Sequence, residues 1–330
     1  MRIGTAGTGA IVETILTNVA KVDGISCEAV FSRTEERGRR LADKFGVEKV
    51  YTEYASMLAD EAVEFIYIAL PNTLHYAYAK QALEAGKHVL CEKPFTTKLS
   101  EAEELIALAK EKGLYLIEMN TTFWHPNYAW IRENLDKIGK LQMISCTFCQ
   151  YSSRYDDLKN GIVTNIFNPE FGGGALMDIN VYNISFVTGL CGKPEEAVYF
   201  ANRFENGVDT SGILVMKYKD FVCQCMGAKD CWADNGVQIL GDRGSIYMPF
   251  ASNNCQSAKL VLKGQLPVNN CQEGQNVKKE VLDQEVSVEG NQWFHEVQQV
   301  VRFVENHQPE DCYARLQATL DTVAVLEQCR

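Results

Sequence analysis

The sequence predicts an α/β protein in which a doubly wound parallel sheet is followed by a second, mainly antiparallel sheet. Three observations support this fold class. The chain has 330 residues, more than one domain usually holds. Short apolar runs alternate with helical patterns up to about residue 120, which is typical of parallel βαβ units. Beyond about residue 190, extended runs are separated by turns, which is typical of antiparallel pairing. We therefore expect domains at residues 1–121 and 122–330.

The elements of the first half follow from the apolar period and the flanking turns. Ligands bind such sheets beyond the carboxyl ends of the strands, so the residues just after each strand are candidates for function. The expected strands are Arg2–Ala6, Ser26–Phe31, Phe65–Leu70, His88–Cys91 and Tyr115–Glu118. Helices are expected at about 11–21, 34–45, 73–86 and 99–112, with a short one at about 53–60.

The second half contains helices before and after a group of strands. The run Ile213–Tyr218 is apolar on both of its alternating faces, and a sheet of this kind needs a cover on each face. We expect helices to cover one face and a second subunit the other. Strands are expected at about 193–204, 210–218, 221–229, 235–241, 244–249, 258–263 and 277–282. Helices are expected at about 125–138, 175–189, 291–306 and 312–328, and the last can pack back on the first domain.

Composition and charge exclude several classes of protein. The net charge of −11 disfavours nucleic acid as a partner, and the apolar runs are too short for a membrane span. The first residues lack the charged and apolar regions of a secretory signal. The chain has 12 cysteines, and Cys146 and Cys149 fall on opposite faces of an extended segment. We therefore expect reduced thiols, no metal site and a cytoplasmic protein.

A glycine turn joins the first strand to the first helix. The backbone amides of such a turn, with the positive end of the helix, bind the pyrophosphate of a dinucleotide. Val12 replaces the third glycine of the usual fingerprint, so a purely structural turn is the alternative. The strand–turn–helix context favours a Rossmann domain that binds a dinucleotide. The binding residues are then Gly7, Thr8, Gly9, Ala10 and Ile11.

The end of the second strand predicts which dinucleotide binds. An NAD site usually has an acidic residue here for the ribose 2′-hydroxyl, whereas this chain has Ser32 and Arg33, with Arg37 one turn further on. A hydroxyl and two guanidinium groups suit a 2′-phosphate, because arginine pairs with phosphate oxygens through two hydrogen bonds. The alternative is that both arginines belong to a solvated helix start. We expect NADP, with NAD as the other possible cofactor.

Two further strand ends carry candidates. Pro71, Asn72 and His75 follow the third expected strand, where they can contact the cofactor or simply start the next helix. Glu92 and Lys93 follow the next strand and are candidates for the same contact. A lysine partly removed from water has a lowered pKa, and it can donate to or polarise a carbonyl or hydroxyl oxygen. A salt-bridged lysine before a helix is the alternative, but the place of Lys93 at a carboxyl strand end favours catalysis.

A triple-glycine turn leads into the helix expected at about 175–189. Asp178 and Tyr182 are four residues apart in it, so both side chains lie on one helical face. A carboxylate and a phenol in one cleft suit an alcohol substrate, because one can orient the hydroxyl while the other carries the proton. Tyr182 needs Lys93 nearby, since an unperturbed phenol is a poor base at neutral pH. Plain packing of Asp178 and Tyr182 is the alternative.

Together these residues resemble the Gfo/Idh/MocA oxidoreductase family. The glycine turn, the Pro-Asn with a following His, the Glu-Lys-Pro and the glycine-rich turn before Asp178 occur in the order and spacing of that family over essentially the whole chain. The resemblance implies a C-terminal α+β domain built on a large open sheet. It also implies oligomerisation through that sheet, as a homodimer or homotetramer. Lys93 matches the lysine of the family, and a cis peptide bond commonly precedes the proline at the position of Pro94.

One branch of the family is more similar than the rest. Asn180 stands where much of the family has glycine, and Tyr182 where it has a histidine. In this the chain is similar to the branch that contains dimeric dihydrodiol dehydrogenase and NADP-dependent D-xylose dehydrogenase. The similarity implies catalysis by Lys93, Asp178 and Tyr182, and binding of the 2′-phosphate by Arg33.

The sequence therefore predicts an NAD(P)-dependent oxidoreductase. We expect it to transfer a hydride between nicotinamide and a secondary alcohol or carbonyl of a sugar, cyclic polyol or diol. A metal is not needed, since Lys93 supplies the positive charge. The alternatives are a regulator without turnover that senses a nucleotide or sugar, and an enzyme that processes glycosides through transient oxidation. The expected substrate contacts are Trp124, which also follows from the resemblance, Tyr151, Arg154 and Phe171.

Overall fold

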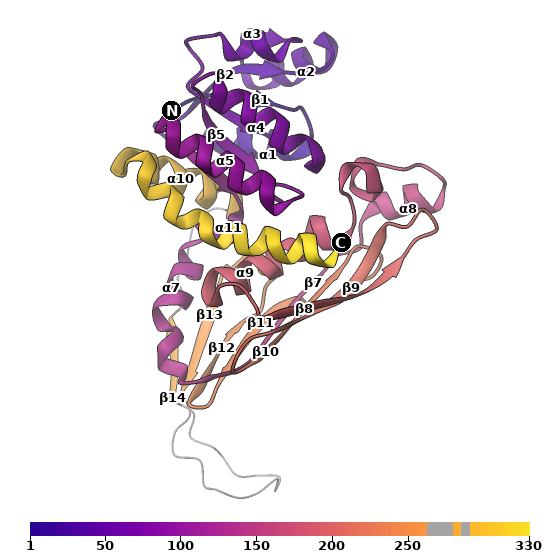
Figure 1. Cartoon of the computed structure of the whole chain (residues 1–330), viewed down its shortest axis with the longest axis vertical. Coiled ribbons are helices and arrows are strands. Elements are labelled where there is room, and N and C mark those ends of the chain that lie inside the picture. The colour runs from indigo at the N-terminus through magenta and orange to yellow at the C-terminus, as the bar shows by residue number, and fades with distance from the viewer. Residues whose placement is uncertain (263–279, 285–290) are drawn as a thin grey trace, which may run out of the picture.

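The computed structural model describes residues 1–262, 280–284 and 291–330. Two sheets lie at opposite ends of the molecule, a parallel one from the first half of the chain and a larger one from the second (Figure 1). The long helix α11 (Pro309–Cys329) runs between them. The predicted fold class is confirmed. Within the described ranges, no helix has both the length and the apolar character that crossing a membrane requires.

The first sheet has six parallel strands in the order β3-β2-β1-β4-β5-β6. The direction of this order changes between β1 and β4, so a ligand crevice is expected beyond the carboxyl ends of these two strands. All five predicted strands are present, and the additional β3 is a short edge strand of 3 residues. The strands are β1 (Arg2–Ala6), β2 (Ser26–Phe31), β3 (Lys49–Tyr51), β4 (Phe65–Ile68), β5 (His88–Glu92) and β6 (Leu116–Met119).

Helices cover both faces of this sheet and bury a separate apolar cluster on each. Two of them, α2 and α5, end at a glycine with positive φ, 70° at Gly46 and 63° at Gly113, a conformation that other residues rarely adopt. These glycines explain why the predicted ends of both helices agree closely with the structure. The helices are α1 (Ala10–Val19), α2 (Glu35–Phe45), α3 (Tyr54–Leu58), α4 (His75–Glu84) and α5 (Leu99–Lys112).

The second sheet has eight strands in the order β14-β13-β12-β11-β7-β10-β9-β8. Neighbours are antiparallel except for β7 and β10, which are parallel. The central strand β7 was absent from the predicted strands. Residues 277–279 of the strand expected at 277–282 lie outside the described residues, and the rest belongs to β14. The strands are β7 (Leu141–Cys149), β8 (Glu196–Arg203), β9 (Asp209–Lys217), β10 (Val222–Ala228), β11 (Gly236–Gly241), β12 (Gly244–Met248), β13 (Ala258–Leu262) and β14 (Glu280–Gln284).

Helix α11 packs against both halves of the molecule. The Glu327 carboxylate accepts a hydrogen bond of 2.8 Å from the backbone N–H of Leu99 in α5, and α11 also contacts α9. The domain boundary at residues 121 and 122 therefore stays a prediction, since the last helix belongs to both packing layers. The remaining helices are α6 (Thr121–Trp124), α7 (Pro126–Asn134), α8 (Ser153–Lys159), α9 (Val181–Cys191) and α10 (Gln292–Asn306).

The two faces of the second sheet differ in burial. Leu214 and Met216 point inward and are fully buried, whereas their neighbours Ile213 and Val215 are 40% and 39% exposed on the other face. The inner face belongs to one large apolar cluster with α7, α9 and α11. Its cysteines are small buried hydrophobic residues, and every cysteine in the described part of the chain is a free thiol. The chain itself therefore covers one face of this sheet among the residues described.

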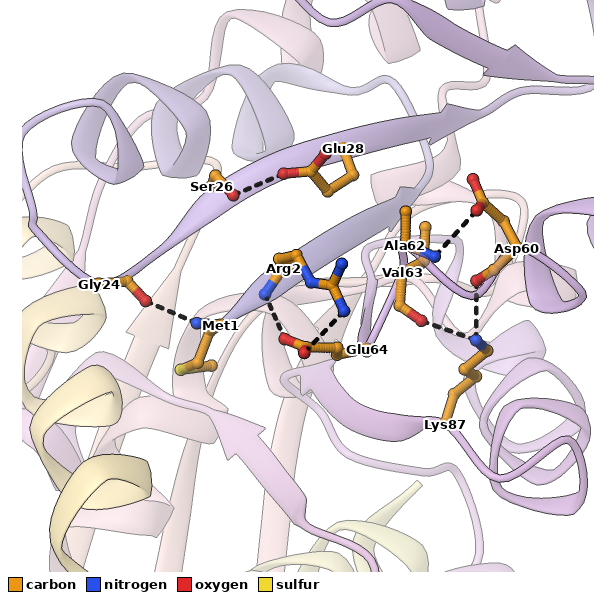
Figure 2. A network of polar contacts seen from close by, with 10 residues as sticks. All are labelled: Met1, Arg2, Gly24, Ser26, Glu28, Asp60, Ala62, Val63, Glu64 and Lys87. Atoms are coloured by element: carbon orange, nitrogen blue, oxygen red, sulfur yellow. Dashed lines mark hydrogen bonds and ion pairs between the residues drawn. The ribbon is translucent and has the colours of Figure 1, made fainter.

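A polar network closes the amino ends of the first sheet (Figure 2). The Glu64 carboxylate accepts hydrogen bonds of 3.0 Å from the Arg2 amide and 2.9 Å from its guanidinium. The Lys87 ammonium donates to the carbonyl oxygens of Asp60 and Val63 at 2.9 and 2.7 Å. Side chains thus satisfy main-chain groups that no strand pairs. This edge stabilises the sheet and leaves the opposite edge for ligands.

Candidate active site

The glycine turn forms an open backbone cradle after β1. Gly7 has a φ of 126°, and a side chain there would collide with the Ala69 carbonyl group, so only glycine fits. A Cβ atom on Gly9 would meet nothing within 4 Å, which leaves room in front of the first turn of α1. The unpaired amides of that turn suit a phosphate group. These residues therefore fit a dinucleotide, with Val12 buried beneath the turn.

Two arginines lie unpaired at the end of β2. Arg33 and Arg37 are exposed, and neither makes a hydrogen bond or ion pair with another residue in the described ranges. Ser32 is buried at the strand end, and the carboxylate of Glu35 is paired with Arg39 at 3.5 Å. Free guanidinium groups at this place suit the additional phosphate of NADP.

His75 joins the ends of β4 and β5. The residue is 1% exposed, and its Nδ1 and Nε2 lie 2.9 Å from the Pro94 carbonyl oxygen and 2.8 Å from the Leu70 carbonyl oxygen. Burial lowers the pKa of this imidazole, so the neutral ring donates to only one of the two carbonyl groups. Both ring nitrogens face the backbone, so the structure places His75 beneath the crevice as a support for the two turns.

Pro71 and Asn72 bring the glycine-rich turn of the second half to the first sheet. Pro71 precedes the short turn η1 (Asn72–Leu74), and the Asn72 side-chain amide donates to the Gly172 carbonyl oxygen at 2.8 Å. This bond connects residues 100 positions apart in the sequence. The two halves of the chain are therefore joined beside the strand ends where the ligand crevice is expected.

A buried hydrogen bond to Glu92 fixes the Glu-Lys-Pro segment. The Tyr67 hydroxyl donates to Glu92 Oε1 at 2.7 Å, and both side chains are buried. Burial raises the pKa of Glu92 to about 7, although Tyr67 and Lys93 act in the opposite direction. The Lys93–Pro94 peptide bond is cis, as the resemblance implied. Glu92 thus anchors the turn from which Lys93 projects.

Lys93 meets Asp178 and Tyr182 between the two halves of the molecule. Its Nζ donates to the Asp178 backbone carbonyl oxygen at 2.8 Å and lies 3.2 Å from Asp178 Oδ1. The same nitrogen lies 4.7 Å from the centre of the Tyr182 ring. The Lys93 and Asp178 side chains are 12% and 25% exposed, so the group is only partly open to solvent. The structure thus brings the three predicted catalytic residues together.

The charges of this group correct one expectation from the sequence. Burial on its own lowers the pKa of Lys93, but Tyr182, Asp178 and Glu92 outweigh it, so the pKa is raised rather than lowered. Burial raises the pKa of Tyr182 as well, and Lys93 offsets only part of this effect. Burial opposes ionisation of Asp178, yet its neighbouring cations hold its pKa well below the usual range. The resting site is therefore an ammonium, a carboxylate and a protonated phenol.

A local π-helical turn places Asp178. The turn η5 (Leu176–Asn180) precedes α9, and π turns of this kind often occur at functional sites. Gly174 before it has a φ of 119°, and a side chain there would collide with Asp209. Asp209 in turn accepts a hydrogen bond of 2.6 Å from the Leu176 amide. The triple-glycine sequence therefore lets the chain turn tightly against β9 and start the helix that carries Asp178.

Asn180 is accommodated by a glycine on the neighbouring strand. Its side chain is fully buried and donates to the Cys225 carbonyl oxygen at 3.1 Å. A Cβ atom on Gly227 in β10 would come within 2.7 Å of the Asn180 Cβ. Asn180 replaces the glycine that is common in the family at this position, and the absence of a side chain on Gly227 makes room for it. Asn180 therefore packs against β10 as part of the core.

Lys229 is the site residue that sequence reasoning missed. Its Nζ forms an ion pair with Asp178 Oδ2, and its side chain is 8% exposed. Its position is fixed because its backbone N–H donates to the Thr210 carbonyl oxygen at 2.8 Å and its carbonyl oxygen accepts from the Ser152 amide at 2.9 Å. The sequence does show a lysine directly after the apolar strand β10, which could have suggested a functional role for Lys229. That β10 ends near Asp178, however, follows only from the order of strands in the sheet.

Trp124 lies away from this group. Its indole N–H donates to the Glu118 carbonyl oxygen at 3.1 Å, and the Arg315 guanidinium stacks 4.7 Å from its ring centre. It lines a separate hollow with about 570 Å³ of empty space, including the part open to solvent, beside α7 and α11. None of its described contacts is with Lys93, Asp178 or Tyr182. The structure therefore does not support the cleft position expected for Trp124.

The other expected substrate contacts lie on the loops after β7. The Tyr151 hydroxyl donates to Asp156 at 2.7 Å and accepts from Lys159 at 2.9 Å, and Arg154 is exposed on α8. Phe171 ends the short turn η4 (Pro169–Phe171), which contacts η1 of the first half. Phe171 therefore lies near the junction of the halves. The described side-chain partners of Tyr151 lie on α8, and none is described for the Arg154 side chain. Their roles toward a substrate stay predictions.

Comparison with known proteins agrees with this architecture. Residues 1–119 match the family described as "Oxidoreductase family, NAD-binding Rossmann fold", and residues 129–247 match the "GFO/IDH/MocA C-terminal domain". The chain is 35% identical over 248 residues to scyllo-inositol 2-dehydrogenase (NADP(+)) IolU of Bacillus subtilis, covering 75% of this chain and 76% of that protein. It is 28% identical to D-xylose 1-dehydrogenase (NADP(+)) of Hypocrea jecorina, covering 79% and 75%.

Solved structures share the fold over the whole chain. The crystal structure of KijD10, a 3-ketoreductase from Actinomadura kijaniata in complex with NADP and TDP-benzene, has a TM-score of 0.81 and 23% identity, covering 100% of this chain and 97% of that one. An NAD binding oxidoreductase from Klebsiella pneumoniae has a TM-score of 0.82 and 20% identity, covering 100% and 96%. At this identity the likeness concerns the fold.

Proposed function

The chain belongs to the Gfo/Idh/MocA oxidoreductase family, and we propose that it transfers a hydride between NADP and a secondary alcohol or carbonyl of a sugar or cyclic polyol. It is an NAD(P)-dependent oxidoreductase, as its relatives are. The observation that carries the proposal is the contact of Lys93, from the first sheet, with Asp178 and Tyr182 of the second half. The bound cofactor supplies or accepts the hydride.

Lys93 holds the reacting oxygen in this proposal. An ammonium has three N–H donors, and the Asp178 carbonyl oxygen and carboxylate accept two of those of Lys93. The third donor is left for a substrate oxygen. Because the pKa of Lys93 is raised by its neighbours despite burial, the group keeps its charge and stabilises negative charge that develops on that oxygen.

Tyr182 exchanges the proton. The raised pKa of its buried phenol keeps it protonated near neutral pH, so it can donate to a carbonyl oxygen while the neighbouring carbon receives a hydride. In the opposite direction Tyr182 must first lose its own proton before it can accept that of an alcohol. The site therefore favours carbonyl reduction near neutral pH and alcohol oxidation at alkaline pH.

NADP is favoured over NAD by the unpaired arginines. Arg33 and Arg37 follow β2, the strand beside β1 in the sheet, and a 2′-phosphate would give them the anionic partner that the described residues do not provide. The two dehydrogenases of Bacillus subtilis and Hypocrea jecorina named above carry NADP(+) in their names, which agrees with this assignment.

A second copy of the chain is the proposed cover of the exposed sheet face. Its large apolar side chains run across several neighbouring strands, whereas monomers rarely expose such a continuous patch. The self-association of one apolar face with the same face of a second copy is an ordinary way to form a symmetric oligomer. The exposed residues are Met143, Val198, Phe200, Ile213, Val215, Val222 and Tyr247.

The test of the function is a spectrophotometric screen of aldoses, inositols and diols with NAD and with NADP. We expect reduction of NADP by at least one polyol or sugar at alkaline pH, with a higher kcat/KM than for NAD. Failure to reduce either cofactor with any member of the panel would contradict the proposal. Product formation without net cofactor reduction would instead favour a reaction through transient oxidation.

A further inference from the structure

Lys229 has hydrogen-bond donors that the described residues do not use. Its ammonium carries three N–H groups, and its one described acceptor is the Asp178 carboxylate. Because the side chain is only 8% exposed, bulk water serves the remaining donors poorly, and buried polar groups need partners. The carboxylate that Lys229 contacts is itself 25% exposed, so the ammonium lies beside a side chain that a bound molecule can reach. We infer from the unused donors that Lys229 can bind oxygen atoms of a bound molecule.

Lys229 and Lys93 form a pair of donors on the two sides of one carboxylate. Lys93 lies on Asp178 Oδ1 and Lys229 on Oδ2, and each keeps at least one donor that no described residue accepts. The two lysines come from different sheets, one directly after β5 and the other directly after β10. Since the two oxygens of a carboxylate are close together, the free donors beside them can reach neighbouring oxygens of one small molecule.

We propose that Lys229 selects substrates with two adjacent oxygens. Lys93 holds the oxygen of the carbon that exchanges the hydride, and Lys229 donates to the hydroxyl group on the next carbon. The sugars and cyclic polyols of the proposed function carry such adjacent oxygens, and recognition of the second oxygen is assigned to Lys229. This inference rests on the proposed function, and it adds a specificity residue that does not take part in the hydride or proton transfer.

The charges of the group agree with this assignment. The Asp178 carboxylate lies between two ammonium groups, Lys93 on Oδ1 and Lys229 on Oδ2, so its negative charge is compensated within the site. A hydroxyl or ketone oxygen accepts hydrogen bonds from ammonium groups without adding a charge, so a neutral polyol leaves this balance unchanged. Loss of Lys229 would remove a donor to the substrate and also leave Asp178 paired with Lys93 alone.

The test compares trans-cyclohexane-1,2-diol with cyclohexanol, which lacks the second hydroxyl, in NADP-dependent oxidation. We expect the wild-type kcat/KM to favour the diol by on the order of 100-fold, because the mono-alcohol leaves a buried donor unpaired. Lys229→Met should reduce the preference to a few-fold by lowering the value for the diol, and Lys229→Arg should keep most of it. Lys49→Met removes an ion pair of 2.7 Å with Asp60 at the far edge of the first sheet and should leave the preference unchanged.

Two results would overturn the inference. Equal losses with both alcohols in Lys229→Met would show that Lys229 acts only by holding Asp178, and an unchanged preference would show that it does not contact the substrate. The same compounds are also titrated by calorimetry into the protein saturated with NADP⁺. Diol-selective binding that requires Lys229, without turnover, would support the inference and contradict the proposed function. Absence of diol selectivity in both binding and turnover would contradict the inference.

Discussion

The two sheets of the molecule are covered in different ways. The first sheet buries a separate apolar cluster on each face. The second buries one face under helices, and its other face, on which Phe200 is 64% exposed, has no cover among the described residues. Nevertheless a lysine from each sheet contacts the Asp178 carboxylate. Lys93 follows β5 of the first sheet, and Lys229 follows β10 of the second. The comparison teaches that the ends of strands build the site, whereas the uncovered face is available for assembly.

Apart from the Lys93 change described last, loss of the Tyr182 hydroxyl should have the largest effect on turnover, and it should leave assembly unchanged. Tyr182→Phe keeps the packing but removes the proton donor, so kcat should fall by about 100-fold or more. The matched control is Tyr218→Phe, which removes a buried hydroxyl bonded to the Gly192 carbonyl oxygen at 2.9 Å and lies outside the site. Sedimentation should show the same assembly for both variants.

The pH dependence sharpens this prediction. The pKa of Tyr182 is raised above its ordinary value of 10.0, so the deprotonated form needed for alcohol oxidation grows throughout the neutral and mildly alkaline range. In the wild type, kcat for oxidation should rise by about tenfold per pH unit there, while kcat for carbonyl reduction stays flat. Tyr182→Phe should lose the rise. A wild-type oxidation profile that levels off near neutral pH would contradict the assignment of Tyr182.

A charge on the uncovered face of the second sheet should weaken assembly and leave the chemical step unchanged, which is the opposite of the effect of Tyr182→Phe. Phe200→Asp places a carboxylate in the proposed contact between copies, and we expect the dissociation constant of the oligomer to rise by about 30-fold or more. Ile162→Asp is the control, since Ile162 is 59% exposed but lies outside the sheet. Light scattering over a dilution series measures the effect. A wild-type protein that is monomeric at all concentrations would show that the face has another role.

The smallest effect is expected at the cofactor end of the first sheet. Arg33→Ser removes one guanidinium from the 2′-phosphate, so the Kd for NADP should rise by about tenfold while that for NAD changes little. Arg40→Ser alters an exposed arginine on the same helix α2 and serves as the control. Fluorescence titration with both cofactors measures the difference. Equal weakening of NAD and NADP would contradict the role of Arg33 in selecting the phosphate.

Much of the fold and three of the four residues that meet at Asp178 could be predicted because the signals are local. Lys93 follows an apolar strand, and Asp178 and Tyr182 share one helical face, so short-range spacing identified all three. Lys229 was missed because its importance depends on β10 lying beside β7 and ending near the π turn, which is long-range information. The pKa of Lys93 was predicted in the wrong direction, since Tyr182 and Asp178 from a distant segment, together with the adjacent Glu92, outweigh burial.

The expected position of Trp124 shows the same limit. An aromatic residue after β6 suited a cleft, but the indole N–H bonds to the Glu118 carbonyl oxygen and the ring stacks with Arg315 from α11. The packing of the last helix against the first half decides this arrangement. A pattern confined to residues near Trp124 does not contain that contact, so the substrate role carried over from the resemblance stays a prediction that the described contacts do not support.

The most direct test of the account is to measure kcat and the NADP Kd of Lys93→Met side by side with the best substrate of the screen. Within the described catalytic group, Lys93 comes from the first half of the chain and contacts Asp178 of the second half. We predict that kcat falls by about 10³-fold or more, equivalent to about 4 kcal/mol of transition-state stabilisation, with a much smaller change in Kd. A Lys93→Met variant with nearly wild-type kcat, or with turnover lost only in proportion to cofactor binding, would contradict the account.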